Sequence, residues 1–344
     1  MRTGLGWGFS IFAVLAACRV EPAPPGEAET TSREGQGGGS AEAAPATPGA
    51  TKARAGAPTT AEPSASAGAA GEPSAETTSG ECGAQRVTLE QLHAGRVRAG
   101  VSVSVGPLVA SSQKFLVSEA KSGSCLWGAF AAGQGLHGAG SGVFLASFGT
   151  PHADGEACVA GTDGLPDDLK IGDVLEAAGK LDEYVPATCS SIAPVQQLMI
   201  DAACPPSRSG TTAEPEPELI DAAFANRLAA GKDPELLRQW SGALVQLEDV
   251  TAQQDEDGDA VFPFGAVRLA ETSLEVHSRL YYFDLSQGGP KASSKAPHYP
   301  YPTAFTSVTG LVFLDYCSWV LAPRDRCADL APPSSGCAGS AVGP

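Results

Sequence analysis

The sequence predicts a mainly β protein in which two small Greek-key barrels, joined by a helical linker, follow a disordered N-terminal stalk. From residue 96 onward, short runs of β-forming residues alternate with Gly, Pro and Asp turns at the spacing of a sandwich or small barrel. Two such series occur, separated by a segment with helical periodicity. Before them, residues 21–79 consist almost wholly of Ala, Gly, Pro, Ser, Thr and Glu.

These differences in composition divide the chain into six predicted segments. They are a signal peptide over 1–17, a disordered tether over 18–80, a first barrel over 81–205, a linker and helix over 206–232, a second barrel over 233–330 and a tail over 331–344.

The N-terminus reads as an export signal, with one early charge at Arg2 and a short apolar run that ends before Cys18. Leu15-Ala16-Ala17-Cys18 resembles the lipobox of bacterial lipoproteins. The resemblance implies that Cys18 is acylated, becomes the new N-terminus and anchors the chain to a lipid membrane. Because Arg19 is not the aspartate that retains such proteins in the inner membrane, we expect an outer-membrane lipoprotein. Whether it faces the periplasm or the cell surface stays open.

The segment over 21–79 contains no aromatic residue and cannot bury enough apolar surface to offset the entropy lost on folding, about 1–2 kcal/mol per residue. We therefore expect a disordered spacer between the anchor and the folded part.

In the first barrel, Thr88 and Gln91 predict a capping box at the start of a short helix. We expect strands over 97–109, 114–119, 126–131, 143–148, 174–184 and 197–200. The second barrel should begin after a helix over 217–230, which ends at Gly231. Its expected strands span 240–249, 261–269, 274–283, 307–316 and 319–321.

The two series resemble each other. Gly106-Pro107-Leu108-Val109 matches Gly242-Ala243-Leu244-Val245, and the segment 179–184 matches 310–316. The opening and closing glycines are 73 residues apart in the first series and 68 in the second. A duplicated module of this length with about five strands suits a barrel of the OB type.

Several short motifs also resemble a known kind of module. They are Gly142-Val143-Phe144-Leu145, Lys170-Ile171-Gly172-Asp173-Val174, Gly179 with Glu183-Tyr184, and Val308-Thr309-Gly310-Leu311 running into Leu321-Ala322-Pro323-Arg324. Over 96–203, and more weakly over 239–330, these resemble the OB-fold-like modules that accompany secreted bacterial nucleases. The nuclease domain has no counterpart here, so the resemblance implies a fold and no activity.

Nine cysteines are present, and eight remain if Cys18 carries lipid. An even number in an exported protein predicts disulfides. Proximity in sequence favours Cys125–Cys158, Cys189–Cys204 and Cys317–Cys327, with Cys82–Cys337 joining the two ends of the fold. No cysteine pair or Cys/His cluster has zinc spacing.

The formal net charge is −17, and residues 96–203 contain six basic and eleven acidic side chains. A nucleic-acid backbone would be repelled on average, so the composition argues against a nucleic-acid partner.

Two motifs begin like cofactor sites. Residues 133–138 match the letters of a dinucleotide fingerprint, but a β-type run follows where a helix is required, which favours a glycine loop. Asp255, Asp257 and Asp259 begin like a calcium loop, yet Ala260 and Ala266 occupy its sixth and twelfth positions. We therefore expect an acidic turn, with weak calcium binding as the minority alternative, and no cofactor.

The five histidines show no pairing at three or four residues, and no Gly-x-Ser-x-Gly motif occurs, so no catalytic residue is predicted. His298, Tyr299, Tyr301 and Phe305 form the most aromatic stretch of the chain. Prolines between them would hold the rings outward for ligand binding. The alternative is that these rings pack over one end of the barrel.

The sequence thus favours a non-catalytic envelope lipoprotein that binds an extracellular polysaccharide or an envelope protein. Two alternatives stay open, a single-stranded nucleic-acid-binding OB protein and a hydrolase with an unrecognised site.

Overall fold

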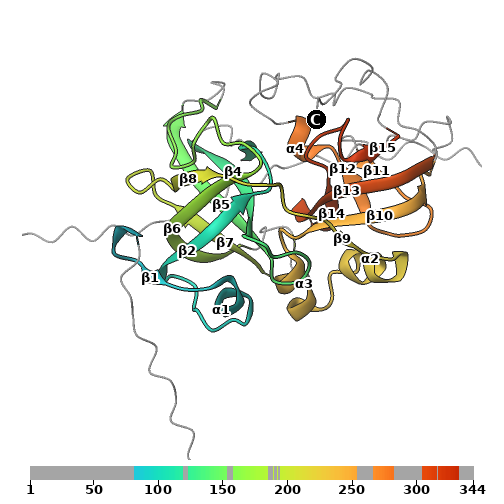
Figure 1. Ribbon diagram of the computed structural model, residues 1–344, viewed down its shortest axis with the longest axis horizontal. Coiled ribbons are helices and arrows are strands. Elements are labelled where there is room, and N and C mark those ends of the chain that lie inside the picture. The colour runs from blue at the N-terminus through green and yellow to red at the C-terminus, as the bar shows by residue number, and fades with distance from the viewer. Residues whose placement is uncertain are drawn as a thin grey trace, which may run out of the picture. The chain divides into compact units, whose positions relative to one another are not determined.

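The computed structural model describes residues 81–118, 123–152, 158–184, 189, 192, 194–253, 266–282, 304–315 and 317–332. The expected signal peptide and tether, and all but the start of the expected tail, lie outside these ranges. The described part is mainly β, with a first half drawn in blue to green and a second half in yellow to red (Figure 1). None of its helices has the length and apolarity needed to cross a bilayer.

The first half is a closed mixed barrel of five strands. They are β2 (Ser102–Ala110), β4 (Gly123–Gly133), β5 (Gly142–His152), β7 (Val195–Ile200) and β6 (Asp173–Tyr184). Neighbours pair in that order, and β6 pairs back with β2. Only β5 and β7 run parallel. These five strands match five of the predicted strands to within a few residues.

Shorter elements surround the barrel. They are η1 (Glu81–Gly83), β1 (Gln85–Arg86), β3 (Phe115–Ser118) and β8 (Ser207–Thr211). The predicted strand over 97–109 begins only at Ser102, whereas β3 lies inside the range predicted for it. The edge strands β1 and β8 were not predicted.

Alternate residues of the strands fill the barrel interior, as Trp127, Ala129 and Ala131 of β4 illustrate. Helix α1 (Leu89–His93) adds Leu89 and Leu92 to the same core. Its predicted capping box is confirmed. The Gln91 backbone N–H donates to Thr88 Oγ1 at 3.2 Å, and the Thr88 N–H donates to Gln91 Oε1 at 3.0 Å.

The second half is an open sheet, where a second closed barrel was expected. Its order is β11 (Ala266–Val267), β12 (Glu275–His277), β14 (Ser318–Ala322), β13 (Ala304–Asp315), β10 (Leu244–Thr251) and β9 (Glu218–Leu219), with β15 (Leu330–Ala331) on β13. Among the described residues of β10 and the β11 region, a single bridge joins Ala252 to Leu269 in place of a ladder.

The helices of the second half correct three expectations. Helix α2 (Ala222–Ala229) starts later than predicted because Asp221 caps it and residues 218–219 pair as β9. Helix α3 (Pro234–Trp240), with Asp233 as its cap, occupies residues before β10 that were not predicted to be helical. The predicted strand 274–283 ends at His277, and residues 279–282 form α4 (Arg279–Tyr282).

The two halves share one strand order. Their registers correct the predicted match between residues 106–109 and residues 242–245. Gly179 pairs with Val103, and Gly310 pairs with Val245. The short parallel strands β1 and β9 support the same equivalence, because Gln85 pairs with Val103 and Glu218 pairs with Val245. Val245 therefore corresponds to Val103, six residues before the predicted Val109.

The closing glycines occupy equivalent tight positions. A Cβ added to Gly179 would lie 2.5 Å from the Met199 carbonyl oxygen, and one added to Gly310 would lie 2.8 Å from the Ala322 carbonyl carbon. Only glycine lets these strands approach their neighbours so closely.

Candidate functional site

The predicted ligand-binding stretch is described in part. His298, Tyr299 and Tyr301 lie outside the described residues. Phe305 lies on β13, where its side chain is only 3% exposed in the core of the second half. Phe305 therefore fills the core and does not point outward from a loop.

The two cofactor-like motifs give different outcomes. Residues 133–138 run from the last residue of β4 into the turn before β5, so the expectation of a glycine loop is confirmed. His137 of this turn lies 2.6 Å from Glu218 of β9. Asp255, Asp257 and Asp259 lie outside the described residues. Within the residues that are described, no group of three His, Cys, Asp or Glu side chains could hold a metal ion.

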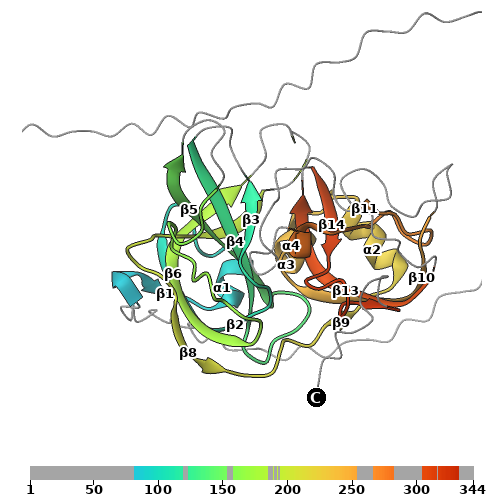
Figure 2. The ribbon, with the colours of Figure 1, turned by 90° about the horizontal axis from the view of Figure 1, so that it is seen from above.

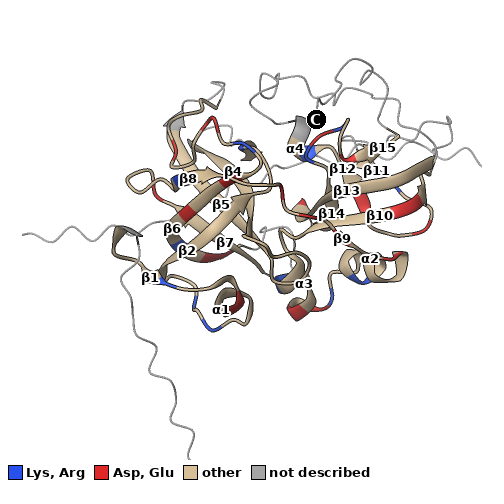
Figure 3. Cartoon of the chain, in the orientation of Figure 1, with Lys and Arg blue, Asp and Glu red and all other residues tan. Residues whose placement is uncertain are grey.

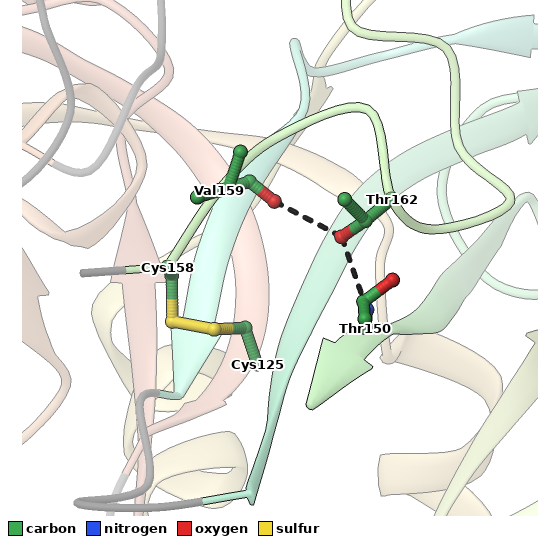
Figure 4. The surroundings of a disulfide bond; sticks show 5 residues. All are labelled: Cys125, Thr150, Cys158, Val159 and Thr162. Atoms are coloured by element: carbon green, nitrogen blue, oxygen red, sulfur yellow. Dashed lines mark hydrogen bonds between the residues drawn. A yellow bond between two sulfur atoms is a disulfide. The ribbon is translucent and has the colours of Figure 1, made fainter. Parts of the chain in front are cut away.

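The predicted disulfide Cys125–Cys158 is confirmed (Figure 4). It fixes the loop after β5 beside the start of β4. Thr162 of that loop accepts a hydrogen bond from the Thr150 N–H at 3.0 Å and donates to the Val159 carbonyl at 3.1 Å.

The other predicted pairings are wrong. Cys82 bonds Cys204, and Cys189 bonds Cys317, in place of Cys82–Cys337, Cys189–Cys204 and Cys317–Cys327. Cys327 is also disulfide-bonded, to a partner outside the described residues. The bonded residues are 122 and 128 positions apart in sequence, because the strand order brings distant segments together. Cys189–Cys317 links the loop after β6 to the equivalent loop after β13.

An aromatic cluster joins the two halves. Phe115, Phe130 and Phe144 project from the outer face of β3, β4 and β5, and Phe313 of β13 packs among them. The Phe313 ring centroid lies 5.4 Å from that of Phe130 and 5.9 Å from that of Phe144. In Figure 2, β3 and β4 are drawn next to α4 and β14, which contribute Leu280, Val320 and Ala322 to the cluster. The outer face of the β4–β5 hairpin is therefore largely buried by the second half.

A histidine forms a polar contact across the same junction. His93 Nδ1 lies 2.7 Å from the Arg238 carbonyl oxygen, and Nε2 lies 2.8 Å from the Gly142 carbonyl oxygen. Burial lowers the pKa of His93, and this outweighs the opposing effect of the two carbonyls. The neutral ring can donate to only one carbonyl, so protonation would add a hydrogen bond but would place a charge in a buried site. Beside the ring, a cavity of about 10 Å³ has room for about one water.

Another histidine lies between two carboxylates. His277 Nδ1 is 3.0 Å from Asp315 Oδ2, and Nε2 is 3.3 Å from Glu275 Oε2. Burial would raise the pKa of Glu275, but hydrogen bonds from Arg268 and His277 lower it overall. A His–Asp pair of this kind can orient a general base, but here the second nitrogen faces a carboxylate and not a nucleophile.

The first barrel also contains a buried cation. Lys114 Nζ contacts Asp163, Asp167 and the Leu165 carbonyl. Figure 3 shows that basic and acidic residues are distributed along the backbone of both described halves. Sequence reasoning missed the roles of Lys114 and His93 because their partners come from segments distant in sequence.

No protein-family model matches this chain, and no curated protein or solved structure matches it at a significant level.

Proposed function

We propose that the chain is a lipid-anchored envelope protein whose two OB-like modules form one non-catalytic block that binds or scaffolds another envelope component. The observation that carries this proposal is the junction between the halves. Phe313 of the second half packs against Phe115, Phe130 and Phe144 of the first. Cys189–Cys317 links the same two halves covalently. A block of this kind offers one fixed binding surface at the end of a tether.

The assignment of two OB-like modules rests on pairing order. In the first half, the strands taken in chain order pair 1-2-3-5-4-1, with the third and fifth parallel, as in an OB barrel. The second half repeats this order without the closing ladder, and β12 and β14 are its parallel pair. In both halves a short parallel strand and a capped helix precede the first barrel strand.

The pattern of disulfides supports export and is consistent with lipid attachment at Cys18. Three described disulfides are typical of an oxidising compartment. Cys327 is bonded as well, and only Cys18 and Cys337 remain as its partner. A Cys327–Cys337 bond would leave Cys18 free for acylation, as the lipobox resemblance implies.

The junction argues against nucleic-acid binding on the first module. OB modules bind single strands on the face of their second and third strands, where exposed rings stack on bases. Here Phe130 and Phe144 on that face are buried beneath Phe313. We expect no salt-sensitive binding when the protein is titrated with a short labelled oligonucleotide at low salt.

The anchor is tested by comparing wild type with Cys18→Ala in cell fractionation and intact-cell protease accessibility. Wild type should sediment with membranes, and Cys18→Ala should be released. The matched control Cys337→Ala removes a different cysteine and should stay membrane-bound. Release of wild type, or retention of Cys18→Ala, would overturn the anchor.

The binding role is tested by crosslinking in cells of the source organism, followed by denaturing purification of the full-length protein. We expect one reproducible adduct with an envelope protein or polysaccharide. Phe313→Ala, which loosens the junction, should weaken this adduct, whereas Phe148→Ala should not. Absence of any adduct under conditions that capture a known envelope complex would overturn the binding role.

A further inference from the structure

The polar cluster around Lys114 is enclosed in the first barrel. Lys114 Nζ lies 2.6 Å from Asp163 Oδ2, 2.5 Å from Asp167 Oδ1 and 3.0 Å from the Leu165 carbonyl oxygen. The side chains of Lys114 and Asp163 are 0% exposed, whereas that of Asp167 is 46% exposed. The centroid of the Trp127 ring lies 5.0 Å from Nζ. An amine and a carboxyl group are thus held together, and neither side chain is exposed to solvent.

The two partners come from different connections of the barrel. Lys114 directly precedes β3, and Asp163 belongs to the loop between β5 and β6, 49 residues away. A covalent bond between them would therefore cross-link two segments at one end of the barrel.

We propose that Lys114 and Asp163 form an intramolecular amide bond, with Asp167 as the group that relays the proton. In the ion pair, one ammonium proton first passes from Nζ to Asp163 Oδ2, which gives a neutral amine and a neutral acid. Nζ then attacks Asp163 Cγ, and Asp167 Oδ1 accepts the proton that the nitrogen loses. Asp167 returns this proton to the departing oxygen. The new N–C bond replaces one C–O bond, and one water leaves without any oxidant or cofactor.

The surrounding atoms suit each step. The Leu165 N–H donates to Asp163 Oδ1 at 2.8 Å, where it would polarise the carbonyl that Nζ attacks and stabilise the oxyanion that forms. Oδ2, the oxygen that must leave, is the one that faces Nζ. Because Asp167 is half-exposed, protons and the released water have a route to solvent.

Burial also favours the product. Two enclosed charges carry a large desolvation cost, whereas an amide is neutral and needs only its N–H and C=O satisfied. After the bond forms, the Leu165 carbonyl and the Asp167 carboxylate remain as acceptors for the single amide N–H. The fixed positions of amine and acid replace a bimolecular encounter, which raises their effective concentration by orders of magnitude.

The test is peptide mass spectrometry on the full-length protein purified from its own cells, reduced and digested with trypsin. We expect a branched peptide that contains Lys114 and Asp163 and is lighter than the two separate peptides by the mass of one water. Trypsin should no longer cleave after Lys114. Unlinked peptides of unmodified mass, with cleavage after Lys114, would overturn the bond and leave an ordinary ion pair.

Two variants test the individual roles. Lys114→Arg keeps a positive charge at the site, lacks the amine nucleophile and should give only unlinked peptides. Asp167→Ala keeps both bonding partners and should leave most of the protein unlinked. If Asp167→Ala is linked as completely as wild type, the relay role of Asp167 is wrong. Circular dichroism checks that each variant folds, and so does the Cys125–Cys158 bond, detected in a separate digest of unreduced protein. The lipid anchor and the binding role are measured separately, so failure of one proposal does not affect the other.

Discussion

Truncation of Phe313 should separate the contribution of the junction from that of the two cores. Phe313 is 8% exposed and packs against rings of the first half, while Phe305 and Val308 on the same strand belong to the core of the second half. Phe313→Ala should therefore lower the free energy of unfolding by about 3–5 kcal/mol, the usual cost of removing a buried Phe ring. Most of the lost stability should come from weaker packing between the two halves.

The assay is urea unfolding followed by circular dichroism, together with hydrogen exchange resolved by peptide. Wild type should unfold in one transition, and Phe313→Ala should show an earlier loss of protection in peptides from β4, β5, β13 and β14. Phe148→Ala is the matched control, because Phe148 lies on the same face of β5 as Phe144 but is 58% exposed. Phe148→Ala should change the free energy of unfolding by no more than about 0.5 kcal/mol. Equal effects of the two truncations would refute the reasoning.

Three further predictions concern single features. Because burial lowers the pKa of His93 below its ordinary value of 6.5, the unfolded chain takes up this proton first on acidification. The free energy of unfolding should fall as pH drops below 6.5, and a fall of the same size in His93→Gln would contradict this. Gly179→Ala places a Cβ against the backbone of Met199 and should cost about 1–3 kcal/mol in urea unfolding, so a cost near zero would mean that the strands separate easily. Replacement of Cys189 and Cys317 by Ser should cost about 2–5 kcal/mol, and a peptide linking Cys189 to Cys204 would disprove the pairing.

Local patterns were sufficient for most of the first barrel. Alternation along β4, with Trp127 and Ala129 facing inward, is a property of neighbouring residues, and so is the capping box at Thr88. The pairings that make the candidate sites are long-range. Lys114 meets Asp163, and Cys189 meets Cys317, only after the strands have found their order. Proximity in sequence therefore succeeded for Cys125–Cys158, whose loop returns directly to its starting strand, and failed for the other pairs.

The second half shows a different limit. Similarity of the letters made Val245 equivalent to Val109, because a glycine lies three residues before each. The strand pairings make Val245 equivalent to Val103. Gly242 lies in the turn after α3 with a positive φ of 77°, whereas Gly106 lies inside β2 at a register shift. The two glycines occupy different backbone conformations, one inside a strand and the other in a turn. An alignment based on these glycines alone therefore misaligned the first strands of the two halves.

The corrected register shows that β13 and β6 carry different kinds of residue at equivalent positions. Lys180 and Asp182 of β6 occupy the ladder positions that Leu311 and Phe313 occupy in β13, counted from the equivalent glycines. On β13 these residues are apolar and bury the aromatic face of the first half. On β6 the same positions carry charges, and Asp182 accepts a hydrogen bond from Gln197 at 3.1 Å. A head-to-tail contact between similar modules continues into a filament when every module repeats it. An equivalent contact through β6 would desolvate those charges, so the residues of β6 disfavour it.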